Sequence, residues 1–246
     1  MQIFRALLLF IFPTPVVRLV VNAIGGKIDK GVRVGFSLVS ARRLYLGAGC
    51  RIGHGSVIRI DRLVMRSGAY IGHMNFCTGP IDMWLGNNSG IGNRNIVSRA
   101  PRGVTLQRAQ LKLGTWAKIT ASHKIDCTMS VLLGDYTTLA GQGSQVWTHG
   151  YVHADEGAGR YRVDGRVVVG NNVYIGSRAL ILAGILIADK IVVGAGLTVS
   201  RNLLEPGFYV SAPMRTLPVP AEPSQRSDLQ EIDRSMLLER VFVRLK

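Results

Sequence analysis

The chain has 246 residues, enough for one large domain or two small ones, and its 47% of apolar residues excludes global disorder. Thirty lysines and arginines against 15 acids give a formal net charge of +15, which suits a nucleic acid, an anionic membrane or a phosphorylated ligand. The three cysteines, Cys50, Cys77 and Cys127, include no CxxC pair, which argues against a disulfide scaffold or zinc ribbon and fits a reducing compartment.

The first predicted element is an apolar N-terminal arm, residues 1–27. Residues 3–24 are strongly apolar, but two prolines and two arginines interrupt them, and a membrane-spanning helix needs ~20 uninterrupted apolar residues. No small-residue cleavage site follows, so we do not expect a secretory signal. Two interpretations stay open: a packed arm or helix pair that caps the domain, and a basic, apolar segment that lies on the cytoplasmic face of the membrane.

Residues 28–217 carry a repeat with a period of six. Apolar β-branched residues recur at every sixth position, mostly followed by a small residue, and a second apolar stripe follows four positions later. Neither the helical period of 3.6 nor the strand period of 2.0 produces this spacing. We therefore predict a parallel β-helix in which three hexapeptides form one triangular coil. The clearest stripe is Val169, Ile175, Ile181, Ile187, Val193 and Val199.

Breaks in the repeat indicate where function lies. Residues 146–166 leave the register and hold two histidines, three acids and three arginines. A polar loop that projects from a rigid solenoid is a common place for a functional site. Residues 74–84 and 93–112 make lesser interruptions. Beyond the solenoid, residues 218–246 are expected to form a linker and a terminal helix with Ser227 as its N-cap.

With these residues in view, the chain resembles the hexapeptide-repeat acyltransferases, in particular their sugar O-acetyltransferase branch. The most specific stretch is residues 167–217, VVVGNNVYIGSRALILAGILIADKIVVGAGLTVSRNLLEPGFYVSAPMRTL, which looks like the terminal acetyl-CoA-binding coils of that branch. The resemblance implies an all-β fold, a left-handed parallel β-helix. It also implies a homotrimer with active sites between neighbouring shafts, and acetyl transfer from acetyl-CoA to a hydroxyl or amine without an acyl-enzyme or a metal.

A catalytic histidine is expected at the start of the 146–166 loop. Direct attack by a hydroxyl needs a general base beside the acceptor and a donor for the developing oxyanion. His149 precedes the CoA-binding coils, where the sugar acetyltransferases carry their catalytic histidine, and an imidazole suits proton transfer at neutral pH. His153 competes with it for this role.

His123 and Asp126 form a second candidate group, about one coil before His149. Two interpretations of His123 stay open. It is either a satisfied, partly buried histidine, or a residue that contacts the acceptor sugar or the His149 ring, oriented by Asp126. In a trimer, His123 of one chain could approach His149 of another.

The resemblance also assigns the acetyl-CoA site. Ser177 and Ala195 occupy amide-donating positions at coil corners, and the Ser177 amide is a candidate oxyanion donor. Tyr174 stands where an aromatic residue, commonly tryptophan, is usual. Arg201 and Arg215 match basic residues that meet the CoA phosphates, to which the arginine fork is suited.

Other functions fit the sequence less well. A γ-type carbonic anhydrase shares the fold but needs three converging histidines, which the spacing of His54, His73, His123 and His149 does not suggest. A nucleotide-sugar N-acetyltransferase and a non-catalytic β-helix scaffold stay open. Nucleic acid is not expected, because no aromatic-basic motif appears. The favoured hypothesis is O-acetylation of a surface polysaccharide or of a lipid- or nucleotide-linked glycan by a cytoplasmic protein, in peripheral contact with the membrane.

Overall fold

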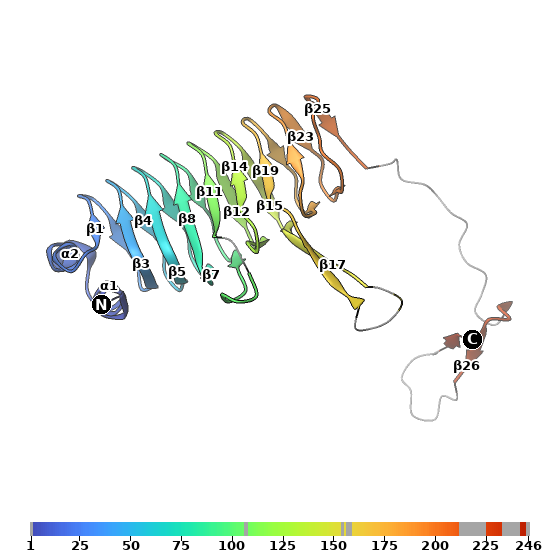
Figure 1. Cartoon of the computed structure of the whole chain (residues 1–246), viewed down its shortest axis with the longest axis horizontal. Coiled ribbons are helices and arrows are strands. Elements are labelled where there is room, and N and C mark those ends of the chain that lie inside the picture. The colour runs from blue at the N-terminus through green and yellow to red at the C-terminus, as the bar shows by residue number, and fades with distance from the viewer. Residues whose placement is uncertain are drawn as a thin grey trace. The chain divides into compact units, whose positions relative to one another are not determined.

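The computed structural model describes residues 2–105, 108–153, 155, 159–211, 225–232 and 242–244. The chain divides into two units, Met1–Ser211 and Ala212–Lys246. The first unit is a solenoid preceded by two helices, α1 (Gln2–Ile11) and α2 (Thr14–Ala23), as Figure 1 shows. Among the described residues, no helix is long and apolar enough to cross a bilayer.

The solenoid has three faces of parallel strands. The first face contains β1 (Lys27–Ile28), β8 (Ile81–Leu85), β11 (Ala109–Leu113), β14 (Val131–Leu133), β19 (Val167–Val169) and β22 (Leu186–Ile187). The second contains β7 (Phe76–Thr78), β10 (Ile96–Ser98), β13 (Lys124–Asp126), β16 (Gln145–Val146), β21 (Leu180–Ile181) and β24 (Thr198–Val199). Two long strands, β3 (Leu38–Leu46) and β5 (Val57–Met65), run through both faces.

The third face stacks nine strands, one from each coil. They are β2 (Arg33–Val34), β4 (Arg51–Ile52), β6 (Tyr70–Ile71), β9 (Gly90–Ile91), β12 (Lys118–Ala121), β15 (Thr138–Gln142), β20 (Tyr174–Ile175), β23 (Ile191–Val193) and β25 (Gly207–Tyr209). Every neighbouring pair within the three faces is parallel, because each coil repeats the path of the one before it.

The core is the shaft of the solenoid, and it is built from the predicted stripe. The six residues from Val169 to Val199 at intervals of six are each at most 2% exposed. Burying a branched apolar side chain of this size stabilises the fold by about 1.5–3 kcal/mol. The repeat is thus the main source of stability, and the predicted parallel β-helix is confirmed.

Insertions gather at one corner of the solenoid, between the second face and the first. The largest insertion is an antiparallel hairpin of β17 (His149–Val152) and β18 (Tyr161–Asp164), which projects from the shaft in Figure 1. We call this edge the hairpin corner; it comprises residues 41–43, 60–62, 79–80, 99–105, 108, 127–130, 147–153 and 159–166. The other coils turn within a few residues, so this corner is where the chain departs most from a regular repeat.

A ladder of buried polar side chains supports the corner between the third face and the second. At each rung a backbone N–H donates to the side chain of the preceding coil, over distances of 2.8–3.2 Å. The rungs are Ser37, Ser56, Asn75, Asn95, His123 and Ser144, each at most 1% exposed. The ladder therefore satisfies turn amides that the strand pairing leaves unpaired.

The N-terminal residues form a helix pair that covers the first coil. Ala6, Leu9, Val17 and Val21 are buried against the solenoid, and the buried Arg5 donates hydrogen bonds to the Ala41 and Arg42 carbonyl oxygens. The inner faces of the two helices therefore cap the first coil, as the first interpretation of the N-terminal arm expects. The outer faces of both helices expose large apolar side chains.

The predicted C-terminal helix is wrong for the residues that the structure describes. Here β26 (Leu229–Glu231) pairs antiparallel with β27 (Phe242–Arg244), so Leu229 lies in a strand. The apolar spacing resembles a helix, but the aromatic and β-branched pair Phe242–Val243 favours extended backbone and gives the first segment a partner. Residues 212–224, 233–241 and 245–246 lie outside the described residues.

Candidate active site

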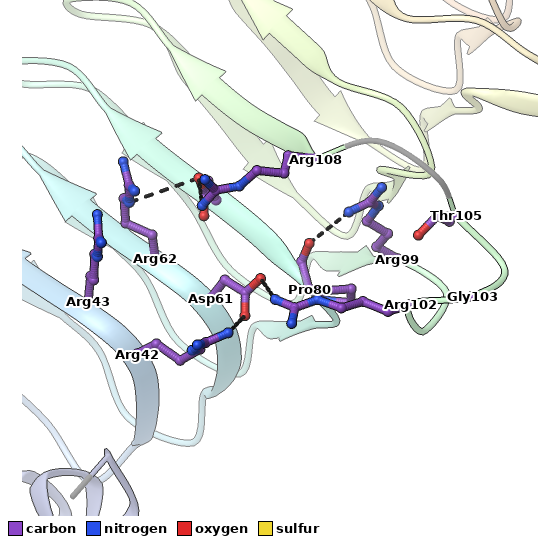
Figure 2. A pocket seen from close by; sticks show the side chains of 11 residues that line it. Arg42, Arg43, Asp61, Arg62, Pro80, Arg99, Arg102, Gly103, Thr105 and Arg108 are labelled. Carbon is purple, nitrogen blue, oxygen red and sulfur yellow. Dashed lines mark hydrogen bonds and ion pairs between the residues drawn. The ribbon is translucent and has the colours of Figure 1, made fainter.

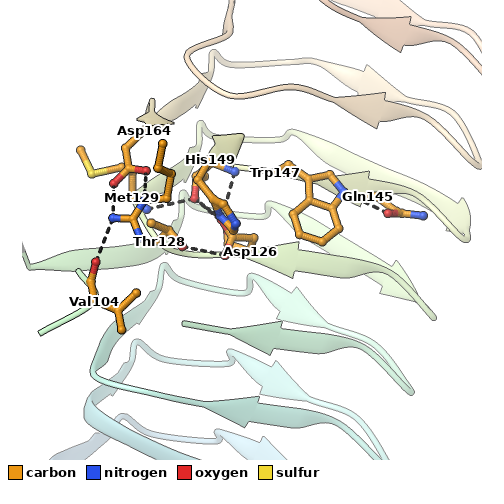
Figure 3. A network of polar contacts seen from close by, with 10 residues as sticks. Val104, Asp126, Thr128, Met129, Gln145, Trp147, His149 and Asp164 are labelled. Carbon is orange, nitrogen blue, oxygen red and sulfur yellow. Dashed lines mark hydrogen bonds and ion pairs between the residues drawn. The ribbon is translucent and has the colours of Figure 1, made fainter. Parts of the chain in front are cut away.

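The hairpin corner brings His149 and Asp126 together. Asp126 ends β13 on one coil, and His149 begins the hairpin one coil later, so stacking places the imidazole over the carboxylate. The His149 Nδ1 atom lies 2.9 Å from Asp126 Oδ2. Figure 3 shows the two side chains facing each other beside Trp147. A pair separated by 23 residues in the sequence is thus made by the coil repeat.

Asp126 is a buried carboxylate with a full set of donors. The Thr128 hydroxyl donates to Oδ1 over 2.9 Å, and the backbone N–H of Thr148 donates to Oδ2 over 3.1 Å. The Thr148 hydroxyl also donates to Oδ2. Burial by itself raises the pKa of Asp126, but these hydrogen bonds and the one from His149 outweigh it and lower the pKa below its ordinary value. Asp126 is therefore ionised at neutral pH.

The ionised carboxylate fixes the tautomer of His149. A carboxylate only accepts hydrogen bonds, so the Nδ1 atom of His149 carries a proton and donates it to Asp126. In the neutral ring the Nε2 atom is then the basic nitrogen. The His149 side chain is 25% exposed, which leaves part of the ring open to an acceptor. Trp147 and Tyr151 meet it edge-on, with ring centroids 5.9 and 6.1 Å away.

His123 lies at a different corner and is a rung of the polar ladder. Its Nδ1 atom accepts from the Ser144 N–H over 3.1 Å, and its Nε2 atom lies 3.0 Å from the Thr120 hydroxyl. Burial is the largest effect on this ring and lowers its pKa to about 4. A ring that is 1% exposed, with both nitrogens engaged, cannot reach an acceptor sugar or a neighbouring chain. The geometry therefore supports the structural interpretation of His123 and contradicts the catalytic one.

His153 does not share the geometry of His149. It follows the last residue of β17 and is exposed. Within the part of the chain that the structure describes, no carboxylate lies within ion-pair distance of it. Of the two loop histidines, only His149 has an orienting partner among these residues.

Ser177 and Ala195 occupy equivalent turn positions on successive coils. They follow β20 and β23, whose register pairs Ile175 with Val193, and the Ser177 carbonyl accepts from the Gly196 N–H over 2.8 Å. Gly141, one coil earlier, has a positive φ of 66°, and a Cβ there would meet the Ser177 side chain. This turn column lies between the third face and the second. In one chain, the second face therefore separates it from His149.

The other residues expected at the CoA site have separate positions. Tyr174 is half exposed on β20. Arg201 is exposed and lines a cavity of about 200 Å³ beside Leu203 and Tyr209, near the C-terminal end of the solenoid. Arg215 lies outside the described residues. No three histidine, cysteine or carboxylate side chains gather as a metal site in the described ranges.

Sequence reasoning missed the residues that surround the His149–Asp126 pair. Thr128 and Thr148 hold Asp126, and Arg162 in β18 pairs with Asp164 over 2.7 Å and donates to the Val104 carbonyl over 2.9 Å. The last contact joins the hairpin to the 99–105 segment. Thr128 and Asp164 lie two residues from their partners, whereas Thr148 lies 22 residues from Asp126 and Val104 lies 58 residues from Arg162. Only the coil stacking reveals the two long-range contacts.

The chain is similar over part of its length to a protein that is named as an acetyltransferase. A curated protein of Bacillus subtilis (strain 168), named "Putative acetyltransferase YvoF", is 32% identical over 89 residues, which are 36% of this chain and 48% of that protein. The chain thus matches about half the length of this relative. No family model matches the chain.

Two solved structures are similar to this chain at low sequence identity. The polysialic acid O-acetyltransferase OatWY is 17% identical, with a TM-score of 0.48 over 74% of this chain and 77% of that one. The hexapeptide-repeat acetyltransferase VCA0836 of Vibrio cholerae, complexed with acetyl-CoA, is 18% identical, with a TM-score of 0.38 over 58% of this chain and 65% of that one. The repeat of six and the solenoid are established by this chain's own sequence and structure, and the proteins to which it is similar are named as acetyltransferases.

Proposed function

We propose that the protein is an acetyl-CoA-dependent O-acetyltransferase that acts on a hydroxyl of a sugar, in a surface polysaccharide or a lipid- or nucleotide-linked glycan. The observation that carries the proposal is the 2.9 Å contact between His149 and the ionised Asp126 on the hairpin corner. The likeness of residues 167–217 to acetyl-CoA-binding coils, and the acetyltransferase name of the curated relative, support the donor.

The geometry suits direct transfer. The Nε2 atom of His149 takes the proton from the sugar hydroxyl as its oxygen attacks the thioester carbonyl carbon of acetyl-CoA. Asp126 stabilises the imidazolium that forms. The C–S bond then breaks, and the CoA thiolate leaves with the proton from the imidazolium. The Ser177 amide is our candidate donor for the oxyanion of the tetrahedral intermediate.

We further propose that the active site is shared between subunits of a homotrimer. Ser177 and Ala195 lie at one corner of the coil and His149 at another, with the second face between them. Two shafts packed side by side bring the turn column of one chain to the hairpin corner of the next. A cleft between subunits therefore supplies both the donor site and the base.

The outer faces of α1 and α2 are our candidate membrane contact. Nine large apolar side chains of residues 2–23 are between 43% and 72% exposed, and this segment contains the partly exposed Arg18 but no acidic residue. Charge and apolar area both suit an anionic phospholipid surface. A helix pair in this position would hold the solenoid beside membrane-linked acceptors.

Mass spectrometry of glycans tests the proposed activity. Candidate nucleotide sugars and lipid-linked glycans are incubated with acetyl-CoA and the wild-type or His149→Ala protein. We expect one acetyl mass to be added by the wild type, and a rate on the order of 10²–10⁴-fold lower for the variant, since it loses the base. The variant should still bind CoA in calorimetry.

Three other results contradict the proposal. Near-normal turnover by His149→Ala removes the base assignment. If amino groups are acetylated and hydroxyls are not, the protein is an N-acetyltransferase. A wild-type protein that does not bind CoA is a scaffold or binding module.

A further inference from the structure

A cavity of about 650 Å³ on the hairpin corner is lined largely by arginines. Its walls come from β3, β5 and the segments that follow β7 and β10, as Figure 2 shows. The charged lining residues are Arg42, Arg43, Arg62, Arg99, Arg102 and Arg108, with Asp61 and Asp82. Six guanidinium groups and two carboxylates leave an excess of four positive charges in one cavity.

Each of the two aspartates, Asp61 and Asp82, is shared between two arginines, so the cavity holds more positive than negative charge. Asp61 lies 2.6 Å from Arg102 and 3.8 Å from Arg42, on either side of it in Figure 2. Asp82 serves Arg62 and Arg108 in the same way, at 3.9 and 3.4 Å. Like charges this close repel one another, so an anion bound among them lowers the energy of the cluster.

Two further features fit an anionic ligand. Burial lowers the pKa of the Arg99 guanidinium, which donates to the Pro80 carbonyl over 2.9 Å at the cavity wall. The Thr105 hydroxyl, on a residue only 7% exposed, lines the cavity and has no hydrogen-bond partner within the described ranges. A buried donor without a partner is costly, and a ligand oxygen would satisfy it.

The cavity and the candidate active site lie on the same corner of the solenoid. Ser98 pairs in register with Asp126, so Arg99 lies one coil away from the carboxylate that holds His149. The segment that carries Arg102 and Thr105 is joined to the hairpin by the hydrogen bond from Arg162 to Val104. The arginine cavity therefore begins about one coil from the His149–Asp126 pair and extends toward the N-terminal coils.

A second cavity of about 560 Å³ continues this path. It shares Arg42, Asp61 and Arg99 with the first, adds Arg59, and reaches Gln2 of α1. Together the two cavities run from α1 to the 99–108 segment, which suits an extended ligand better than a single small anion.

We propose that the arginine cavity binds anionic groups of the acceptor, so that the acceptor is an acidic glycan lying along the hairpin corner with one hydroxyl at His149. This inference rests on the proposed acetyltransferase function. Arginine forks bind carboxylate and phosphate alike, so the shared chemistry is an oxyanion on the glycan.

Binding of defined anions tests the proposal without acetyl-CoA. The probes are a galacturonate hexamer, its neutral methyl ester, and inorganic pyrophosphate, each titrated by calorimetry into the full chain. The cavity variant is Arg43→Gln/Arg102→Gln/Arg108→Gln, which removes exposed guanidiniums. The control variant, Arg33→Gln/Arg51→Gln/Arg66→Gln, removes three exposed arginines that lie outside both cavities.

We expect the wild type to bind the acidic hexamer but not its ester, and the cavity variant to bind it on the order of tenfold or more weakly. The control variant should stay within about twofold, because salt-screened charges far from the cavity contribute little. If pyrophosphate binds and the acidic hexamer does not, the cavity is a phosphate site. If pyrophosphate and the hexamer compete for binding, the cavity accepts both phosphate and carboxylate.

Several results overturn the proposal: neither anion binds, the ester binds as well as the acid, or both variants weaken binding equally. Tighter binding of a single-stranded oligonucleotide than of either anion would assign the cavity to nucleic acid instead. If the protein binds these anions but transfers no acetyl group, the assignment of the cavity as an anion site stands and only the proposed acetyltransferase function is contradicted.

Discussion

At the scale of single residues, Asp126 decides the state of His149. Its carboxylate accepts four hydrogen bonds, from two groups of Thr148, from Thr128 and from His149, and its lowered pKa keeps it charged. The charge has two consequences for the imidazole. It holds the proton on Nδ1 and, in the proposed reaction, would stabilise the imidazolium.

Replacing Asp126 by asparagine tests this role. Asp126→Asn keeps the size of the side chain but removes the charge, and the amide nitrogen cannot accept the Nδ1 proton. We expect kcat to fall by about 10²–10⁴-fold with little change in KM for acetyl-CoA, measured by steady-state kinetics. Asp164→Asn, in the same hairpin but paired with Arg162, should retain most activity and serves as the control. Equal losses in both variants would mean that the hairpin is merely destabilised.

At the scale of elements, the buried ladder makes stability depend on pH. His123 has a pKa of about 4 in the folded chain, against an ordinary value of 6.5. Between these values the unfolded chain binds a proton that the folded chain does not, so stability is full above pH 6.5 and falls as the pH drops toward 4. At about 1.4 kcal/mol per pH unit, the loss is at most about 3–4 kcal/mol.

Denaturant unfolding at several pH values measures this contribution. His123→Asn retains an oxygen acceptor for the Ser144 N–H, as Asn95 provides for His123 itself. We expect the variant to lose less stability than the wild type between pH 6.5 and 4. His153→Asn, which changes an exposed histidine, should follow the wild type. Identical pH slopes for all three proteins would contradict the assignment.

The outer helix faces give a further prediction at this scale. Ile3→Ser/Leu19→Ser removes two side chains that are 67% and 72% exposed, so folding should be unaffected. We expect the variant to bind vesicles of phosphatidylglycerol and phosphatidylcholine several-fold more weakly in co-sedimentation, since apolar burial drives insertion. Leu204→Ser/Phe208→Ser, also exposed but distant in the solenoid, is the matched control. Self-association instead of vesicle binding would assign the faces to a second copy of the chain.

The repeat was predictable and the contacts between coils were not. A period of six is a local pattern that the shaft imposes on every coil, so the stripe from Val169 to Val199 could be found by counting. The sequence placed Asp126 beside His123, three residues away, whereas stacking of β13 and β16 places it under His149. The prediction of a terminal helix was wrong at Leu229–Glu231 because this segment pairs with the strand Phe242–Arg244, and a local apolar pattern does not reveal such a partner.

At the scale of the solenoid unit, three features share one edge. The helix pair, the arginine cavities and the Asp126–His149 pair follow one another along the hairpin corner. The turn column with Ser177 and Ala195 lies on another edge. Under the proposed function, one chain would carry the acceptor path and the base on one edge and the donor site on another, so a complete site would need two chains.

Mixing two inactive variants tests this division. Ala195→Phe fills the exposed turn where the CoA arm is proposed to lie, and His149→Ala removes the base. Each variant alone should be inactive, but in a ring of three with sites between subunits, about a quarter of the sites in an equal, random mixture combine intact His149 with intact Ala195. We expect co-expressed variants to regain up to that share of wild-type acetyl transfer. No recovery in a mixture that forms mixed trimers by native mass spectrometry would place both residues of each site in one chain.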